Sequence, residues 1–163
     1  SVLRAISTSG ANGMYLLVGG ERLTDGDLQY GHFLQPTVLE GDPDNEGHLA
    51  LRDEIFGPVV GACRVPNLAE AIRVTNLVSH RHAAAIFTDS IRAMDEFEEG
   101  ALAGMIHVCN LTAGGDPQTE FGGMGGDTSI GNREMGPHAM DTFLWDQTFD
   151  ENRRGAVLAA GAR

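Results

Sequence analysis

The stretch that decides the fold spans residues 59–109 and reads VVGACRVPNLAEAIRVTNLVSHRHAAAIFTDSIRAMDEFEEGALAGMIHVC. Residues 59–65, 83–88 and 105–109 are short apolar runs with little alternation. Such runs are typical of parallel strands that are buried on both faces. Two longer segments with helical periodicity separate them. The order strand, helix, strand, helix, strand predicts an α/β fold with a mostly parallel, open sheet and flanking helices.

The two predicted helices carry start signals and an inward face. Asn67 precedes the first helix and Glu70 follows three residues later, in a capping-box-like pattern. Asp89 or Thr88 is expected to cap the second helix. The inward positions recur at helical spacing, and they are Leu68, Ala71, Ile72, Thr75 and Val78 in the first helix and Ile91, Met94, Phe97 and Leu102 in the second.

The N-terminal part of the chain has weaker signals. Residues 1–13 predict a short helix that ends at a glycine, and an apolar run follows at 14–18. Residues 33–39 have extended character, and their proline limits them to an edge or the start of a strand. Residues 40–48 are rich in acids and turn formers, and this pattern favours a solvated loop.

The C-terminal part changes character. Residues 110–136 are rich in glycine, which in a compact chain indicates a functional loop or disorder. Residues 137–143 begin with proline and predict a short helix, and residues 144–149 are compatible with a strand. We expect one partial domain over residues 1–149 and a C-terminal tail at 150–163.

The charge balance excludes several classes of function. The chain has 163 residues, 23 acids and 11 bases, for a net charge of -12, and every base is arginine. Binding to nucleic-acid phosphates needs clustered bases, so we expect no nucleic-acid partner. The lack of lysine excludes a lysine Schiff base and a P-loop lysine. No apolar run approaches the roughly 20 residues of a membrane helix, so we expect no membrane partner.

The cysteines and histidines offer few candidates for chemistry. The two cysteines do not make a disulfide framework, so a reducing cytoplasm is the expected compartment. Cys63 lies in an apolar run and is interpreted as a buried structural thiol. Cys109 ends the third predicted strand and is interpreted as structural, since a reactive role would need a stabilised thiolate. No acid or cysteine at ligand spacing joins His80 and His82, so we expect a solvated junction there and no metal site.

Two motifs are candidate binding segments. In EIFGPV, Glu54 and Phe56 precede a Gly-Pro turn and a buried strand, and a loop beside a strand end is a usual ligand site in open α/β sheets. The structural alternative is an exposed acid and a core phenylalanine. The glycines at 121–126 and 131–136 permit close backbone approach to a ligand. They are not a dinucleotide fingerprint, because they do not lie between a strand and a helix of a β-α-β unit, and a flexible loop is the alternative.

Together with their flanks, these motifs resemble the aldehyde dehydrogenase superfamily, specifically the C-terminal part of its members. The matches follow the family order from about residue 14 to residue 149. They comprise GHFLQPTVL at 31–39, DEIFGPV at 53–59, NLAEAIRVTN at 67–76, AAAIFTD at 83–89, GMIHV at 104–108, FGG at 121–123 and GNREMG at 131–136.

The resemblance implies oxidation of an aldehyde to a carboxylic acid with NAD or NADP as cofactor. In that family a cysteine thiolate attacks the aldehyde, hydride passes to the nicotinamide, and water releases the acid. Glu54 resembles the carboxylate that hydrogen-bonds the nicotinamide-ribose hydroxyls, and Phe56 resembles the aromatic residue beside that ribose. Phe121 lies where the family's turn lines the substrate tunnel. Cys109 falls beside the substrate-side loop, where many relatives have asparagine.

The resemblance covers only the last third or so of such an enzyme, so the expected fold is an incomplete catalytic domain. The family's nucleophile precedes the E-I-F-G-P-V segment, but no cysteine precedes Cys63 here. We therefore expect the chain to be inactive alone and to pair with the missing N-terminal half or form a homo-oligomer. The alternatives are a truncated relative that acts as a non-catalytic interaction module, or repurposed non-redox chemistry near Cys109 and Phe121.

Several residues depart from the family pattern. Arg81 and His82 replace a common Gly-Leu before the strand at 83–88. Glu120 replaces the usual proline before the Phe-Gly-Gly turn, and Gly125 stands where many relatives have lysine. These departures change the expected tunnel shape and the expected choice of aldehyde.

Overall fold

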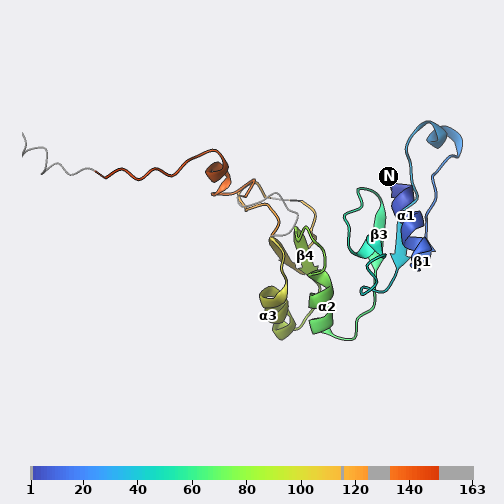
Figure 1. Cartoon of the computed structure of the whole chain (residues 1–163), viewed down its shortest axis with the longest axis horizontal. Helices are drawn as coiled ribbons and strands as arrows, with labels where there is room; N and C mark the ends of the chain where they lie inside the picture. Colours follow the sequence, from blue (N-terminus) through green and yellow to red (C-terminus); the bar gives the residue numbers. More distant parts are fainter. Residues whose placement is uncertain (1, 115, 125–132, 151–163) are drawn as a thin grey trace, which may run out of the picture.

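The computed structural model of the chain describes residues 2–114, 116–124 and 133–150. Gly125, the first two residues of the GNREMG motif and the predicted tail beyond residue 150 lie outside these ranges. Figure 1 shows two groups of helices and strands, one built from the N-terminal part of the chain and one from the region that follows. None of the helices in the described ranges is long and apolar enough to cross a bilayer.

The first group contains a small mixed sheet and one helix. Its elements are α1 (Val2–Ala11), β1 (Tyr15–Val18), the 3-10 helix η1 (Gly26–Tyr30), β2 (Thr37–Glu40), the 3-10 helix η2 (Leu49–Leu51) and β3 (Val59–Ala62). The strand order is β1-β2-β3, with β1 antiparallel to β2 and β2 parallel to β3. The predicted N-terminal helix is therefore confirmed, and the apolar run after it forms a strand.

The second group is an α/β unit with its own apolar core. Its elements are α2 (Leu68–Thr75), β4 (Ala83–Ile86), α3 (Ile91–Gly100), β5 (Met105–Val108) and the 3-10 helix η3 (Ala139–Thr142). β4 and β5 pair in parallel, with Ala83 opposite Met105. Ile72 of α2 and Phe97 of α3 are buried with Ala84, Ala101 and Ala103. The predicted helix, strand, helix, strand order is confirmed from α2 onward.

The predicted α/β fold with mostly parallel strand pairing is confirmed, but the strands divide between two sheets. The sequence predicts that β3 joins the same parallel sheet as β4 and β5, but β3 pairs with β2, and β4 and β5 form a separate pair in the described part of the chain. Backbone pairing with β2, in which Thr37 lies opposite Val59, holds β3 in the first sheet. α2 packs through Ile72 in the core of β4 and β5. Two of the three strand pairings are nevertheless parallel.

The helix caps confirm one prediction and correct another. Asn67 Oδ1 accepts a hydrogen bond from the Glu70 backbone N–H at 2.9 Å and starts α2 as expected. α3 is capped by Ser90, whose Oγ accepts from Ala93 N at 3.3 Å, and not by Asp89 or Thr88. The Thr88 hydroxyl instead accepts a hydrogen bond from the Ser90 N–H. This contact holds the backbone of the capping residue just before α3 begins.

The segment at 144–149 does not form a strand. It follows η3 as an extended stretch without strand pairing in the described residues (Figure 1). A strand needs a neighbour to satisfy its backbone groups, and no described segment is paired with this one. Its Trp145 is 96% exposed and takes no part in an apolar core.

The acidic loop at 40–48 is anchored by a buried histidine. His48 is 4% exposed. Its Nδ1 accepts from Asp42 N at 2.9 Å, and its Nε2 lies 3.0 Å from the Asn12 carbonyl oxygen. A neutral imidazole that accepts at Nδ1 and donates at Nε2 satisfies both contacts. This anchor fixes the end of α1 against the loop that leads into η2 and the EIFGPV motif.

Candidate functional site

The side chains of Glu54 and Phe56 lie in the loop between η2 and β3, at the amino end of β3. Thr37 N donates to Pro58 O at 2.8 Å and ties this loop to the start of β2. Both predicted binding residues are exposed, and the Phe56 ring is 85% accessible. The structural alternative for Phe56, a core phenylalanine, is therefore wrong. A fixed backbone that presents an exposed carboxylate and an exposed ring is suited to binding another molecule.

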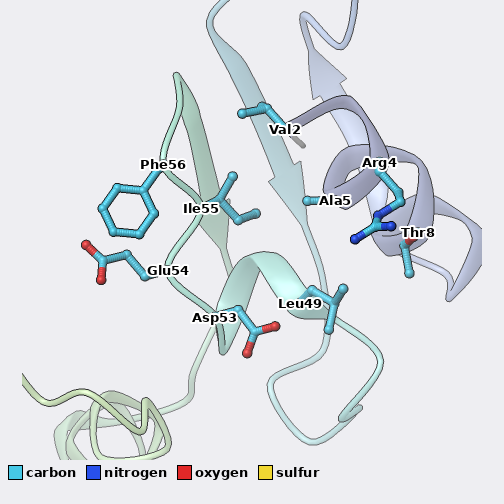
Figure 2. Close-up of a pocket in the computed structure, with 9 residues that line it drawn as sticks. All are labelled: Val2, Arg4, Ala5, Thr8, Leu49, Asp53, Glu54, Ile55 and Phe56. Carbon is cyan, nitrogen blue, oxygen red and sulfur yellow. The ribbon is translucent and has the colours of Figure 1, made fainter. Parts of the chain in front are cut away.

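A hollow of about 380 Å³ lies between this loop and α1. Figure 2 shows Glu54 and Phe56 on one side of the loop and Ile55 on the other side, toward α1. The helix contributes Arg4 and Thr8 to the wall. No sequence pattern marks these two residues as part of a site, because residues 1–13 predict only a helix. Its packing against the loop is a tertiary contact.

Phe56 also borders a second hollow. This one measures about 520 Å³ and includes Arg22, His32 and Leu34 in its lining. Arg22 is held in place, because its Nη2 donates to the Gly31 carbonyl oxygen at 2.8 Å. Both hollows fall in the size range of small-molecule sites. The exposed Phe56 ring is thus available to a ligand from either side.

The Phe-Gly-Gly turn packs against the amino ends of β4 and β5. Arg133 Nη1 donates to the carbonyl oxygens of Gly122 and Gly123 at 2.7 and 3.2 Å. A side chain at Gly104 would collide with the Gly122 carbonyl. Glycine is therefore required at the start of β5 for the turn to approach this closely. Phe121, half-buried, is held at this end of the strand pair.

Cys109 lies at the opposite end of the same strands. It directly follows β5, its side chain is exposed, and its Sγ donates to Thr88 O at 3.4 Å. Gly104 precedes β5 and contacts the turn that follows Phe121. Four strand residues thus separate the two ends, or about 13 Å at the usual rise. The structure does not bring Cys109 and Phe121 together, and no described contact joins either one to Glu54 or Phe56. Their assignment to one substrate tunnel stays a prediction.

Cys63 has the environment of a structural thiol. Its side chain is half-buried just after β3. Burial raises the pKa of the Cys63 thiol, and the nearby Asp42 carboxylate raises it further. Both effects disfavour the thiolate, which is the nucleophilic form. This environment agrees with the structural interpretation.

The histidine pair before β4 splits between two environments. His80 Nδ1 lies 3.2 Å from Ser79 Oγ. The His82 ring instead packs edge-on against Phe121, with ring centroids 4.7 Å apart and an interplanar angle of 68°. Within the described ranges, no three His, Cys, Asp or Glu side chains gather in a metal-binding arrangement. His82 is therefore a neighbour of a predicted site residue, which the sequence marked only as a departure from the family pattern.

Similarity to characterised proteins agrees with these motifs. The α-ketoglutaric semialdehyde dehydrogenase of Bacillus subtilis is 37% identical over 131 residues, which cover 80% of this chain and 26% of that protein. The corresponding Haloferax volcanii enzyme is 32% identical over 148 residues, covering 91% of this chain and 30% of that protein. The 2,5-dioxopentanoate dehydrogenase of Saccharolobus solfataricus is 36% identical over 121 residues, covering 74% of this chain and 25% of that protein.

Solved structures show the same relationship in three dimensions. HpcC from Thermus thermophilus aligns with a TM-score of 0.77 at 28% identity, over 93% of this chain and 31% of that one. Betaine aldehyde dehydrogenase from Staphylococcus aureus, solved with NAD+, aligns with a TM-score of 0.78 at 25% identity, over 88% of this chain and 28% of that one. The chain thus spans between a quarter and a third of the length of these relatives. The aldehyde dehydrogenase family model matches residues 1–149, and the chain belongs to the aldehyde dehydrogenase family.

Proposed function

We propose that this chain forms part of the cofactor and substrate sites of an NAD(P)-dependent aldehyde dehydrogenase. Residues 1–149 would be the second half of its catalytic domain and the segment that returns from it. The observation that carries the proposal is the exposed Glu54 and Phe56 pair at the rim of a hollow, inside a chain that matches the family over residues 1–149. Its two free cysteines support a reducing cytoplasm as its compartment.

The chemistry of these two residues fits a nicotinamide nucleotide. The Glu54 carboxylate is acceptor-only and has room to accept hydrogen bonds from the two ribose hydroxyls. The Phe56 face offers apolar surface to the ribose and the nicotinamide ring. The bound nucleotide would supply the hydride acceptor. The role of this chain would be to hold the nicotinamide end in a fixed orientation, which is how a protein contributes to cofactor chemistry.

The substrate we propose is a semialdehyde that is oxidised to its acid. This proposal is supported by the relatives, which include dehydrogenases of α-ketoglutaric semialdehyde and of malonate semialdehyde. Phe121 would line the aldehyde site on this chain. The attacking thiolate would come from outside it, because Cys63 is half-buried with a raised pKa and Cys109 lies at the far strand end from the Phe121 turn.

We infer that the 163 residues alone do not turn over, and that they work with the missing N-terminal half or in a homo-oligomer. The exposed apolar side chains of β1 support a partner. A second candidate function rests on the same observation: a truncated relative that acts only through its interaction surface. The two candidates differ in one property, because only the first requires Glu54 and Phe56 to bind a nicotinamide nucleotide.

Titration of the chain with nicotinamide mononucleotide, followed by saturation-transfer NMR, separates these candidates. We expect saturable binding that is about tenfold weaker in Glu54→Gln, since one set of charge-assisted hydrogen bonds is lost. Glu46→Gln is the matched control, because it removes the same charge from an exposed loop position, and it should bind like the unmodified chain. Absence of binding, or equal binding by both variants, would favour the interaction module.

The proposed inactivity is tested by absorbance at the NADH band. The pure chain is mixed with NAD or NADP and α-ketoglutaric semialdehyde. We expect no reduced nucleotide above the rate of the reagents alone. Turnover that scales with the chain's concentration would contradict the need for a second half.

A further inference from the structure

His82 puts a polar ring beside Phe121, where the family pattern has an apolar leucine. The two rings meet edge to face, with centroids 4.7 Å apart and planes at 68°. This is a favourable geometry for an aromatic pair. Both residues are half-buried. The imidazole and the phenyl ring therefore form one continuous surface at the amino ends of β4 and β5.

The backbone at this position is fixed from two sides. The Arg81 carbonyl accepts from Gly104 N at 2.9 Å and from Met124 N at 3.1 Å, and Met105 N donates to His82 O at 3.0 Å. Arg81 itself has a φ of 46°, which is uncommon for a residue other than glycine. Such a conformation persists only where its surroundings hold it. The ring of His82 is thus held against the Phe121 turn and cannot relax away by a simple backbone shift.

The imidazole has unused hydrogen-bonding capacity. Within the part of the chain that the structure describes, no hydrogen bond is made by either ring nitrogen of His82, whereas His80, two residues earlier, lies 3.2 Å from Ser79 Oγ through its Nδ1. A neutral imidazole carries one donor and one acceptor. A half-buried polar group gains free energy when a ligand or water satisfies it. Leucine at this position would offer a ligand no such contact.

We propose that His82 contacts the substrate and selects aldehydes that carry a second oxygen-bearing group. The oxygen of that group would accept a hydrogen bond from the N–H of the imidazole ring. This inference rests on the proposed function, because it takes Phe121 as part of the aldehyde site. A site that offers a hydrogen bond favours ligands able to accept it over ligands that cannot. Since the ring is only half-buried, we expect a modest preference of about tenfold.

The test is NMR of the whole chain with isotope-labelled histidine. The sequence has six histidines, and the His82 signals are identified by their loss in His82→Gln. The probes are α-ketoglutarate, the acid formed from the semialdehyde, and pentanoate, which has the same number of carbons but lacks the keto group and the second carboxylate. We expect saturable shifts of the His82 ring signals and about tenfold tighter binding of α-ketoglutarate than of pentanoate. A stationary His82 signal would overturn the proposal.

The variant His82→Leu restores the residue common in the family, and it should bind the two acids about equally. Retained preference in this variant would refute the role of the imidazole. Phe121→Leu provides a second check, because loss of its ring current should move the His82 signals and leave the other histidines in place. Unmoved His82 signals would show that the ring contact is absent and would also refute the proposal.

Failure of this inference is distinguishable from failure of the proposed function. Nicotinamide mononucleotide should bind His82→Leu as it binds the unmodified chain, since His82 has no described contact with Glu54 or Phe56. If the nucleotide binds and the preference between the two acids is absent, only the role of His82 is overturned. If the chain prefers α-ketoglutarate over pentanoate but does not bind the nucleotide, the role of His82 is supported and the assignment of Glu54 and Phe56 to the cofactor is refuted.

Discussion

Cys109 shows how a single backbone angle limits the choice of residue. It follows β5 with a φ of 51°, in the left-handed region that costs most residues about 1–2 kcal/mol. Asparagine tolerates this region better than cysteine does. The side chain is exposed, with one weak Sγ contact to Thr88 O at 3.4 Å. Backbone conformation therefore outweighs side-chain packing at this position.

We expect Cys109→Asn to stabilise the chain by about 0.5–1 kcal/mol, since it relieves part of the left-handed strain. The matched variant Cys109→Val should destabilise it by about 1 kcal/mol or more, because a β-branched residue fits this region poorly. Urea unfolding followed by circular dichroism measures both changes. Equal stability of the two variants would show that the backbone at this position is not constrained.

Single residues also mark the limit of inference from the sequence. The sequence identified Glu54 and Phe56 as a motif, and the structure places both on the surface beside a hollow. It gave no reason to single out Arg4, which reaches the same hollow from α1. It noted His82 only as a departure, because the contact with Phe121 joins positions far apart in the chain. Local patterns identify residue types, but tertiary packing decides their neighbours.

At the scale of elements, Asn76 ties α2 to the connection between α3 and β5. Its Nδ2 donates to Gly100 O at 2.9 Å, and its Oδ1 accepts from Leu102 N at 2.7 Å. The residue is half-buried, and its hydrogen bond to Gly100 O is partly protected from water, whereas the one from Leu102 N is exposed. One side chain therefore satisfies two backbone groups where α3 ends.

Asn76→Ala should lower the free energy of unfolding by about 1–3 kcal/mol, since it removes both hydrogen bonds. Asn76→Asp keeps the acceptor for Leu102 N and loses the donor, so its loss should be smaller. Urea denaturation of the three chains gives the comparison. A loss in Asn76→Ala that does not exceed the loss in Asn76→Asp would contradict this account of the junction.

The elements that the sequence predicted well are those whose signals are local. α2 and α3 bury Ile72 and Phe97 as their helical spacing predicts, and Asn67 caps α2 as expected. Two other predicted inward positions are wrong, because Ile91 is 74% and Leu102 is 42% exposed. The cap of α3 shifted by one residue to Ser90, because adjacent polar residues offer similar local signals. The prediction of a strand at 144–149 is wrong for a different reason. Its composition permits a strand, but pairing depends on a partner that local sequence does not specify.

At the scale of the whole molecule, strand pairing was the least predictable feature. The sequence predicts one sheet through β3, β4 and β5, and the structure has two. Which strand lies beside another is decided by contacts between distant segments, such as the pairing of Thr37 with Val59. The relatives are about three times longer than this chain, since 131 aligned residues make up 26% of one and 148 make up 30% of another. The strand pairs seen here are therefore only part of the fold of those relatives.

β1 presents an exposed apolar surface. All four of its side chains, from Tyr15 to Val18, are more than half exposed. β1 also has only one strand neighbour in the described sheet. An edge strand with exposed apolar side chains is a favourable site for association.

We therefore expect the isolated chain to self-associate through β1, and Leu17→Glu to weaken this association at least about tenfold, since a charge at the buried interface must be desolvated. Ile91→Glu is the matched control, because it places the same charge on an exposed apolar residue at the start of α3, outside β1. Sedimentation velocity over a concentration series measures the association of each chain. If both variants associate like the unmodified chain, β1 is not the contact surface. If only Leu17→Glu becomes monomeric, β1 is the contact surface, and the same surface is the first candidate for contact with the further chain that the longer relatives contain.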